Sequence, residues 1–95
     1  MSNNIKSDSA WIFHGEKGRF ASGVFTSISQ AEDWIEKHKL TGVLTEYPFN
    51  VGVYDWSIEN GMFEAKKEVQ RTSEFIQTFT SAGQEHFHYE HGIKD

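Results

Sequence analysis

Aromatic side chains set the main constraint on what this chain can fold into. Eight phenylalanines, three tyrosines and three tryptophans lie among 95 residues. Each such side chain buries about 150–250 Å² when it is enclosed, so a domain of this size can hold a dense core without disulfide bonds. The sequence has no cysteine, which excludes disulfides, thiolate metal sites and a cysteine nucleophile. A chain of this length is expected to form one domain.

The charge balance is acidic and favours a protein partner over a nucleic acid. Nine basic and fourteen acidic residues give a net charge of −5. Nucleic-acid binding and adhesion to anionic membranes both depend on lysine and arginine, so neither is expected. A basic protein partner is compatible with this charge. No apolar run is long enough for a signal peptide or a membrane span, and we therefore expect a cytoplasmic protein.

Short apolar runs alternate with turn-forming residues after a polar segment, residues 1–9, which we expect to be disordered. This alternation predicts a single α+β domain over residues 10–92: an antiparallel β-sheet with two or three helices packed on one face. Strands are predicted at residues 10–14, 19–25, 43–47 and 84–89, the first two forming a hairpin. A short continuation of the third strand is possible at 49–53.

The first helix is the most clearly marked element. Ser27 and Ser29 both suit an N-cap, and apolar residues then recur with helical spacing. Thr41-Gly42 is predicted to end this helix. Further helices are predicted at residues 54–60 and from the cap Thr72 onward, with an exposed loop at 64–71.

Histidines gather near the C-terminal end and suggest a metal site. His86 and His88 on a strand would point to the same face, with Phe87 and Tyr89 facing the core. His91 would complete a nitrogen and oxygen ligand set of the kind that zinc or nickel accepts, with Glu85 and Glu90 nearby. The alternative is a polar strand face that binds metal only fortuitously.

Acid–base catalysis is less well supported. His14 with Glu16, or His86 with Glu85, would be the candidate pairs. Only two arginines, Arg19 and Arg71, are available to stabilise a phosphoryl transition state. No nucleophile elbow, phosphate-binding loop or zinc-protease helix motif is present. We therefore expect a protein that is not an enzyme and needs no cofactor.

Several segments together resemble a family of small bacterial domains of unknown function. The resemblance covers nearly the whole of residues 10–92 and rests on these segments: Trp11 to Gly15, Arg19 to Phe25, Ala31 to Ile35, His38 to Gly42, Leu44 to Pro48, Tyr54 to Trp56 and His86 to Glu90. Stand-alone members resemble immunity proteins of bacterial toxin–immunity systems, including contact-dependent growth inhibition. The resemblance implies a small, non-catalytic, cytoplasmic inhibitor.

The leading hypothesis is an immunity-type protein that neutralises a cognate toxin, most simply a basic ribonuclease, by covering its active site. An acidic surface suits this role because nucleases carry basic residues that hold phosphates. The candidate contact residues are carboxylates on the predicted helices and the third strand: Glu32, Asp33, Glu36, Glu46, Asp55 and Glu59. Two alternatives stay open: a metal-binding module or metal-dependent enzyme centred on His86, His88 and His91, and a housekeeping protein-binding domain.

Overall fold

The computed structural model describes residues 9–95. Residues 1–8, which make up nearly all of the segment predicted to be disordered, lie outside the described part. The chain divides into two compact units. In the described part, the first unit comprises residues 9–49 and 84–95, and the second comprises residues 50–83. The predicted domain boundaries, 10–92, stay a prediction.

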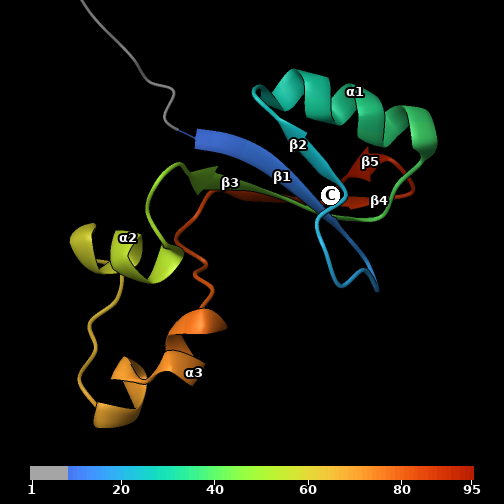
Figure 1. Ribbon diagram of the computed structural model, residues 1–95. Helices are drawn as coiled ribbons and strands as arrows, with labels where there is room; N and C mark the ends of the chain where they lie inside the picture. The colour runs from blue at the N-terminus through green and yellow to red at the C-terminus, as the bar shows by residue number, and fades with distance from the viewer. Residues whose placement is uncertain (1–8) are drawn as a thin grey trace, which may run out of the picture. The chain divides into compact units, whose positions relative to one another are not determined.

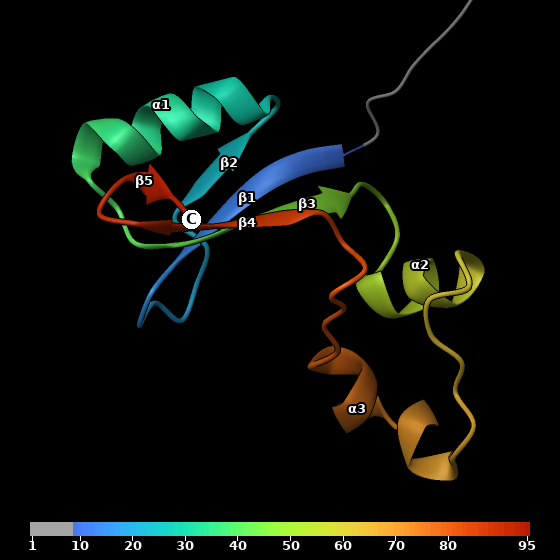
Figure 2. The same ribbon diagram turned by 180° about the vertical axis from the view of Figure 1, so that it is seen from behind.

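The first unit is a five-stranded sheet with one helix (Figures 1 and 2). All neighbouring strands pair antiparallel, in the order β2-β1-β3-β4-β5. The strands are β1 (Ser9–Gly15), β2 (Gly23–Phe25), β3 (Gly42–Pro48), β4 (His86–Glu90) and β5 (Ile93–Lys94). The predicted α+β class with an antiparallel sheet is confirmed. The short edge strand β5 was not predicted.

The β1–β2 hairpin is confirmed, but its second strand is shorter than predicted. Pairing begins only where Phe13 faces Gly23, whereas 19–25 was expected to be strand. Residues 19–22 are exposed and bury no apolar surface that would hold them against the sheet. The turn before them is closed by the Gly18 N–H, which donates to the Gly15 carbonyl at 3.0 Å.

Helix α1 (Ile28–His38) begins as predicted and ends earlier. The Ser27 hydroxyl is the cap and accepts a 3.3 Å hydrogen bond from the Gln30 N–H. The predicted end at Thr41-Gly42 is wrong, because Lys39 already adopts the left-handed conformation, with φ 55°. The Lys39 N–H donates to the Glu36 carbonyl in the last turn. Glycine is the residue that usually takes this left-handed position at a helix end.

The core of the first unit lies between α1 and one face of the sheet (Figure 1). Its buried residues are Phe13, Ala31, Ile35, Leu44 and Tyr89. The ring of Trp34 packs edge-on against that of Phe13, with the centroids 5.8 Å apart. Because side chains alternate along a strand, the residues next to these in β1, β3 and β4 point to the opposite face.

The second unit is built from α2 (Val53–Glu59), the 3₁₀ helix η1 (Glu68–Arg71) and α3 (Ser73–Gln77). Both predicted α-helices are confirmed, with the Thr72 hydroxyl capping α3 by accepting from the Phe75 N–H at 3.2 Å. The predicted loop at 64–71 instead contains η1, and the suggested strand continuation at 49–53 is turn followed by helix. A cluster of four rings forms its apolar centre: Tyr54, Phe63, Phe75 and Phe79.

Two further observations bear on the fold expectations. Only α1 belongs to the unit that contains the sheet, so the packing of two or three helices on one face stays a prediction. Among the helices of residues 9–95, none is both long enough and apolar enough to span a bilayer.

Candidate functional site

The three predicted acidic residues of α1 differ in their surroundings. Asp33 and Glu36 are exposed, as predicted. Glu32 was expected on the solvent face, and this is wrong. Its carboxylate is partly buried, accepts a 2.6 Å hydrogen bond from the Tyr89 hydroxyl, and pairs with the Lys94 ammonium at 2.9 Å.

These contacts also shift the pKa values of Glu32 and Tyr89. The hydrogen bond from Tyr89 and the contact with Lys94 hold the pKa of the Glu32 carboxyl below its ordinary value of 4.5. Burial and the hydrogen bond to Glu32 raise the pKa of the Tyr89 phenol well above its ordinary value of 10.0. The cluster ties α1 to the C-terminal strands, which is a structural role.

The remaining predicted carboxylates are divided between the two units. Glu46 on β3 is half-buried and accepts a 2.6 Å hydrogen bond from the Ser9 hydroxyl. Asp55 and Glu59 are exposed on α2, in the second unit. The structure thus places four of the six predicted contact residues in the first unit and two in the second.

The histidine cluster forms only in part. His86 and His88 share one face of β4, as predicted, with ring centroids 5.3 Å apart, while Phe87 and Tyr89 belong to the core side. His91 lies in the turn after β4 with φ 52°, and its N–H donates to the Thr41 hydroxyl. Within residues 9–95, no three histidine, aspartate or glutamate side chains are grouped so as to hold a metal ion.

The histidines of the two predicted acid–base pairs donate hydrogen bonds to main-chain carbonyls. A carbonyl oxygen can only accept, so the His14 Nε2–H donates to the Gly18 carbonyl at 2.6 Å. The His86 Nδ1–H donates to the Gln84 carbonyl at 2.8 Å in the same way. These nitrogens therefore hold main-chain groups, whereas a catalytic pair would direct them to Glu16 or Glu85.

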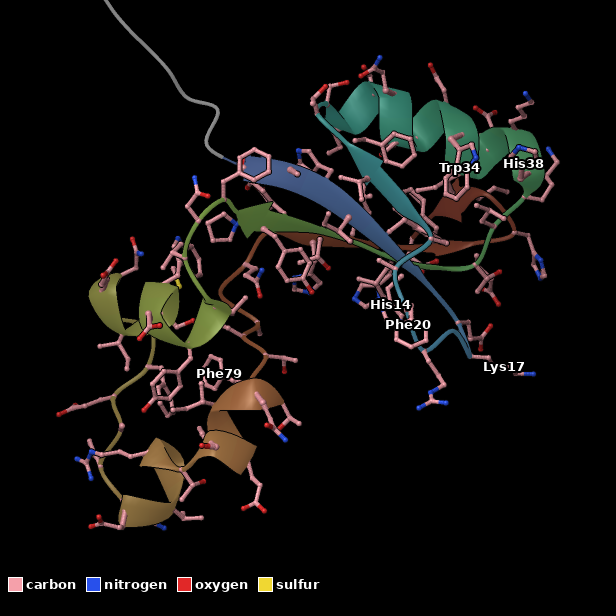
Figure 3. All side chains as sticks on the ribbon, in the orientation of Figure 1. His14, Lys17, Phe20, Trp34, His38 and Phe79 are labelled. Carbon is pink, nitrogen blue, oxygen red and sulfur yellow. The ribbon has the colours of Figure 1, made fainter. Side chains whose placement is uncertain are left out.

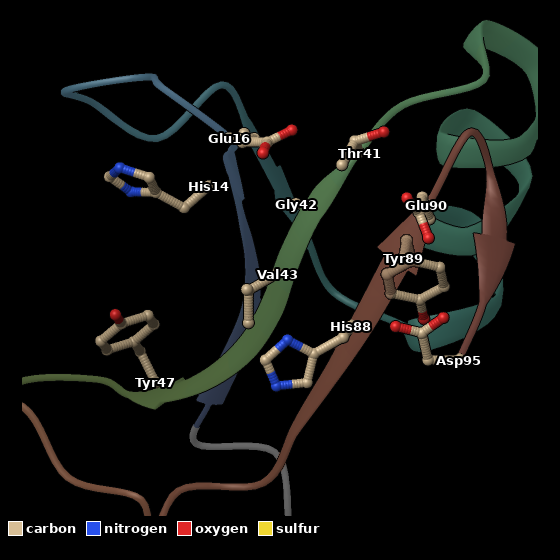
Figure 4. Close-up of a pocket in the computed structure, with 11 residues that line it drawn as sticks. His14, Glu16, Thr41, Gly42, Val43, Tyr47, His88, Tyr89, Glu90 and Asp95 are labelled. Carbon is tan, nitrogen blue, oxygen red and sulfur yellow. The ribbon is translucent and has the colours of Figure 1, made fainter.

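The first unit has a shallow pocket on the sheet face opposite α1 (Figure 4). Its floor is a row across three strands, in which His14, Val43 and His88 are register partners. In the close-up the Tyr47 ring stands on the same side as the His14 imidazole, and the His88 imidazole lies in the middle. The pocket has a volume of about 520 Å³, within the range of small-molecule and side-chain sites.

Three carboxylates also line the pocket: Glu16 stands next to His14, and Glu90 and Asp95 stand on the side of β4 (Figure 4). Main-chain hydrogen bonds fix the backbone of two of these residues, Glu16 and Asp95. The Glu16 N–H donates to the Thr41 carbonyl, and the Asp95 N–H donates to the His88 carbonyl, each at 2.9 Å. No lysine or arginine is among the lining residues, so the pocket is acidic.

Exposed apolar side chains extend this surface. Ile12 and His14 lie two positions apart on β1 and therefore share the pocket face. Val24 is the register partner of Ile12, so it lies on the same face, and it is 67% exposed. Phe20 is 78% exposed, and Figure 3 shows it with His14 on the side of the sheet away from α1. We call the following set the open sheet face: His14, Glu16, Phe20, Val24, Val43, Tyr47, His88, Glu90 and Asp95.

Sequence reasoning missed the open sheet face because its members come from five separate segments. Strand alternation could have placed His14 and His88 on the face away from the apolar core. It could not have aligned the two residues across β3, because that requires the register. The positions of Glu16 and Asp95 depend on hydrogen bonds to residues distant in sequence.

Comparison with known proteins identifies a family and gives no activity. The model of a family described as "Domain of unknown function (DUF7710)" matches residues 10–95, and thus both units. No curated protein and no solved structure matches the chain.

Proposed function

The chain belongs to the DUF7710 family of domains of unknown function, and we propose that it is a non-catalytic binding protein whose partner is a basic protein. The observation that carries this proposal is the open sheet face. It combines two exposed apolar side chains, Phe20 and Val24, with a shallow pocket. The rings of His14, Tyr47 and His88 and three carboxylates line this pocket, and no lysine or arginine does. Aromatic centres with a polar rim are typical of protein interfaces.

The charge of the whole chain supports the same partner. With a net charge of −5, the protein attracts a basic molecule over the distance at which it approaches, and such attraction raises association rates. The exposed carboxylates of the helices contribute to this field: Asp33, Glu36, Asp55 and Glu59. Glu32 and Glu46 add charge, but their carboxylates already have partners within the chain.

We propose further that the partner is a bacterial toxin domain, most simply a ribonuclease, and that the chain acts in the cytoplasm as its immunity protein. A ribonuclease must bind phosphates with basic side chains, which an acidic concave face would cover. The resemblance of the sequence segments to immunity-type domains is the second support for this assignment. The mechanism would be occlusion, without any chemical step by this chain.

Co-expression tests the proposal. The chain is produced together with the C-terminal domain encoded immediately upstream of its gene, and growth is followed with and without the chain. Relief of toxicity, and a one-to-one complex on mixing the purified proteins, is the expected result. A toxic neighbour that this chain neither binds nor relieves would contradict the immunity assignment. A complex without any toxicity would favour the housekeeping alternative.

A metal-binding module is the second candidate, favoured by one observation. The Nδ1–H of His86 is held by the Gln84 carbonyl, which leaves Nε2 with its lone pair, the usual arrangement in a metal-ligating histidine. His88 lies beside it on the same strand face. Calorimetric titration of untagged protein with zinc or nickel, with His88→Ala as control, distinguishes this candidate from the first.

A further inference from the structure

We propose that the pocket on the open sheet face receives an arginine side chain of the basic partner. This inference rests on the proposed function and names the group that the site would recognise. The groups concerned are the carboxylates of Glu16, Glu90 and Asp95 and the rings of His14, Tyr47 and His88, all of which line the pocket.

The charge of the pocket selects a cation. Three of its lining residues carry carboxylates, and none is lysine or arginine. The one ion pair found among residues 9–95, between Lys94 and Glu32, belongs to the opposite side of the sheet, where Glu32 meets the core residue Tyr89. No described ion pair therefore neutralises the carboxylates of the pocket, and an incoming cation would be attracted to all three.

The rings favour arginine over lysine. A guanidinium is flat, stacks on aromatic and imidazole faces, and donates two parallel hydrogen bonds to a carboxylate. Figure 4 shows the His14 and Tyr47 rings on one side of the pocket with Glu16 beside His14, the His88 ring in the middle, and Glu90 and Asp95 on the other side. An extended arginine would place its methylene stem and guanidinium along this row. A lysine ammonium is a compact, strongly hydrated charge and gains less from the rings.

The pocket is held in shape before any ligand arrives. His14 is fixed by its hydrogen bond to the Gly18 carbonyl, and the main chain of Asp95 is fixed to that of His88. Gly42 lies between strands β1 and β4, and a Cβ at this position would overlap the His14 carbonyl oxygen. Preorganised groups lose less entropy when a ligand binds. The fixed positions of these groups therefore favour a higher affinity for the ligand.

The test uses a probe in place of the partner. Nα-acetyl-arginine N-methylamide is titrated into the full chain labelled with ¹⁵N, and amide shifts are followed by NMR. The neutral citrulline analogue, which keeps the shape and loses the charge, is the control ligand. We expect saturable shifts at residues 14–16, 42–43, 88–90 and 95 with the arginine probe only. Shifts that are absent, scattered, or equal for the two ligands would overturn the inference.

Charge variants provide the second arm. Replacing both Glu90 and Asp95 by their amides, Glu90→Gln with Asp95→Asn, should raise the dissociation constant of the probe about fivefold, the effect expected from two partly exposed ion pairs. The matched control, Glu68→Gln with Glu74→Gln, removes the same charge from exposed positions of the second unit and should change the dissociation constant less than about twofold. Equal effects of the two double variants would mean that only net charge attracts the probe.

The two proposals fail in different ways. If the probe does not bind but the upstream-encoded toxin domain is still neutralised, the proposed function stands and the arginine pocket is wrong. If the probe binds in the pocket and no toxin is neutralised, the pocket is a cation site of a protein with a different partner.

Discussion

The Tyr89 hydroxyl donates a 2.6 Å hydrogen bond to the carboxylate of Glu32, 57 positions earlier in the chain. This contact joins β4, the strand next to the edge strand β5, to α1, and the Lys94 ammonium pairs with the same carboxylate oxygen. The cluster explains how the short edge strand β5 is held at the end of the sheet. A partner would therefore meet Glu32 as a carboxylate that already has two partners within the chain.

Replacing Tyr89 by phenylalanine should lower the free energy of unfolding by about 1–2 kcal/mol, because a hydrogen bond to a charged acceptor is lost while the ring stays packed. Urea unfolding of Tyr89→Phe measures this change. Tyr47→Phe is the matched control, since Tyr47 is exposed and has no hydrogen bond to its hydroxyl among those of residues 9–95. Equal stability of Tyr89→Phe and the parent protein would contradict the structural role.

The same cluster predicts how stability changes in acid. The pKa of Glu32 is lowered in the folded chain, chiefly by the hydrogen bond from Tyr89. Its contribution to stability is therefore present above the unfolded value, 4.5, and is lost as the pH falls through the lower folded value. Melting temperatures measured from pH 6 downward should decrease less steeply for Glu32→Gln than for the parent chain. Parallel curves would contradict this assignment.

In alkaline solution the controlling group is Tyr89. Its pKa is raised on folding, so its contribution is complete below the unfolded value, 10.0, and is lost as the pH rises toward the folded value. The parent chain should therefore lose stability above pH 10 more steeply than Tyr89→Phe, which has no phenol to ionise. A chemical denaturation series across this range measures the difference between the two slopes.

Gly42 should not tolerate a side chain. A Cβ there would overlap the His14 carbonyl oxygen and would lie 2.7 Å from a ring carbon of Phe13. We expect Gly42→Ala to destabilise the fold by about 1–3 kcal/mol through overpacking. Its register partner Gly15 is the control, since a Cβ at Gly15 would meet its nearest neighbour at 3.8 Å. If Gly15→Ala and Gly42→Ala had the same stability, the close approach would be wrong.

The second unit should depend on its aromatic cluster. The Phe63 ring lies 4.8 Å from that of Phe79 and 5.8 Å from that of Tyr54, measured between centroids. Phe63→Ala should cost about 3 kcal/mol, because a large side chain is removed from a packed cluster. Hydrogen exchange of the α2 and α3 amides reports the loss. Phe20→Ala, which removes a side chain that is 78% exposed, should leave the same amides unchanged.

Local patterns predicted most of the secondary structure. The Gly-containing turn after β1, the cap Ser27 and the cap Thr72 are short-range features, and each marks an element that forms. Lys39 shows the limit of such patterns: it adopts a left-handed conformation that glycine usually supplies, so the end of α1 was placed too late. The strand β5 has only two residues and carries no alternation that could reveal it.

The candidate site was harder to predict than the fold. Glu32 and Glu46 look like surface carboxylates in the sequence, and each is engaged by a partner that is 57 or 37 positions away. His86 and His88 were placed correctly because strand alternation acts over two residues. The pocket itself depends on the register of three strands, which no single segment encodes.

The most direct test of the central claim is a titration of ribonuclease activity. The purified toxin domain encoded upstream is assayed on an RNA substrate while the purified chain is added in known ratios. Activity should disappear at one equivalent of the parent chain, and the amide variant Glu90→Gln with Asp95→Asn should require more protein than the Glu68→Gln with Glu74→Gln control. Activity that persists at a large excess of the parent chain would contradict the account.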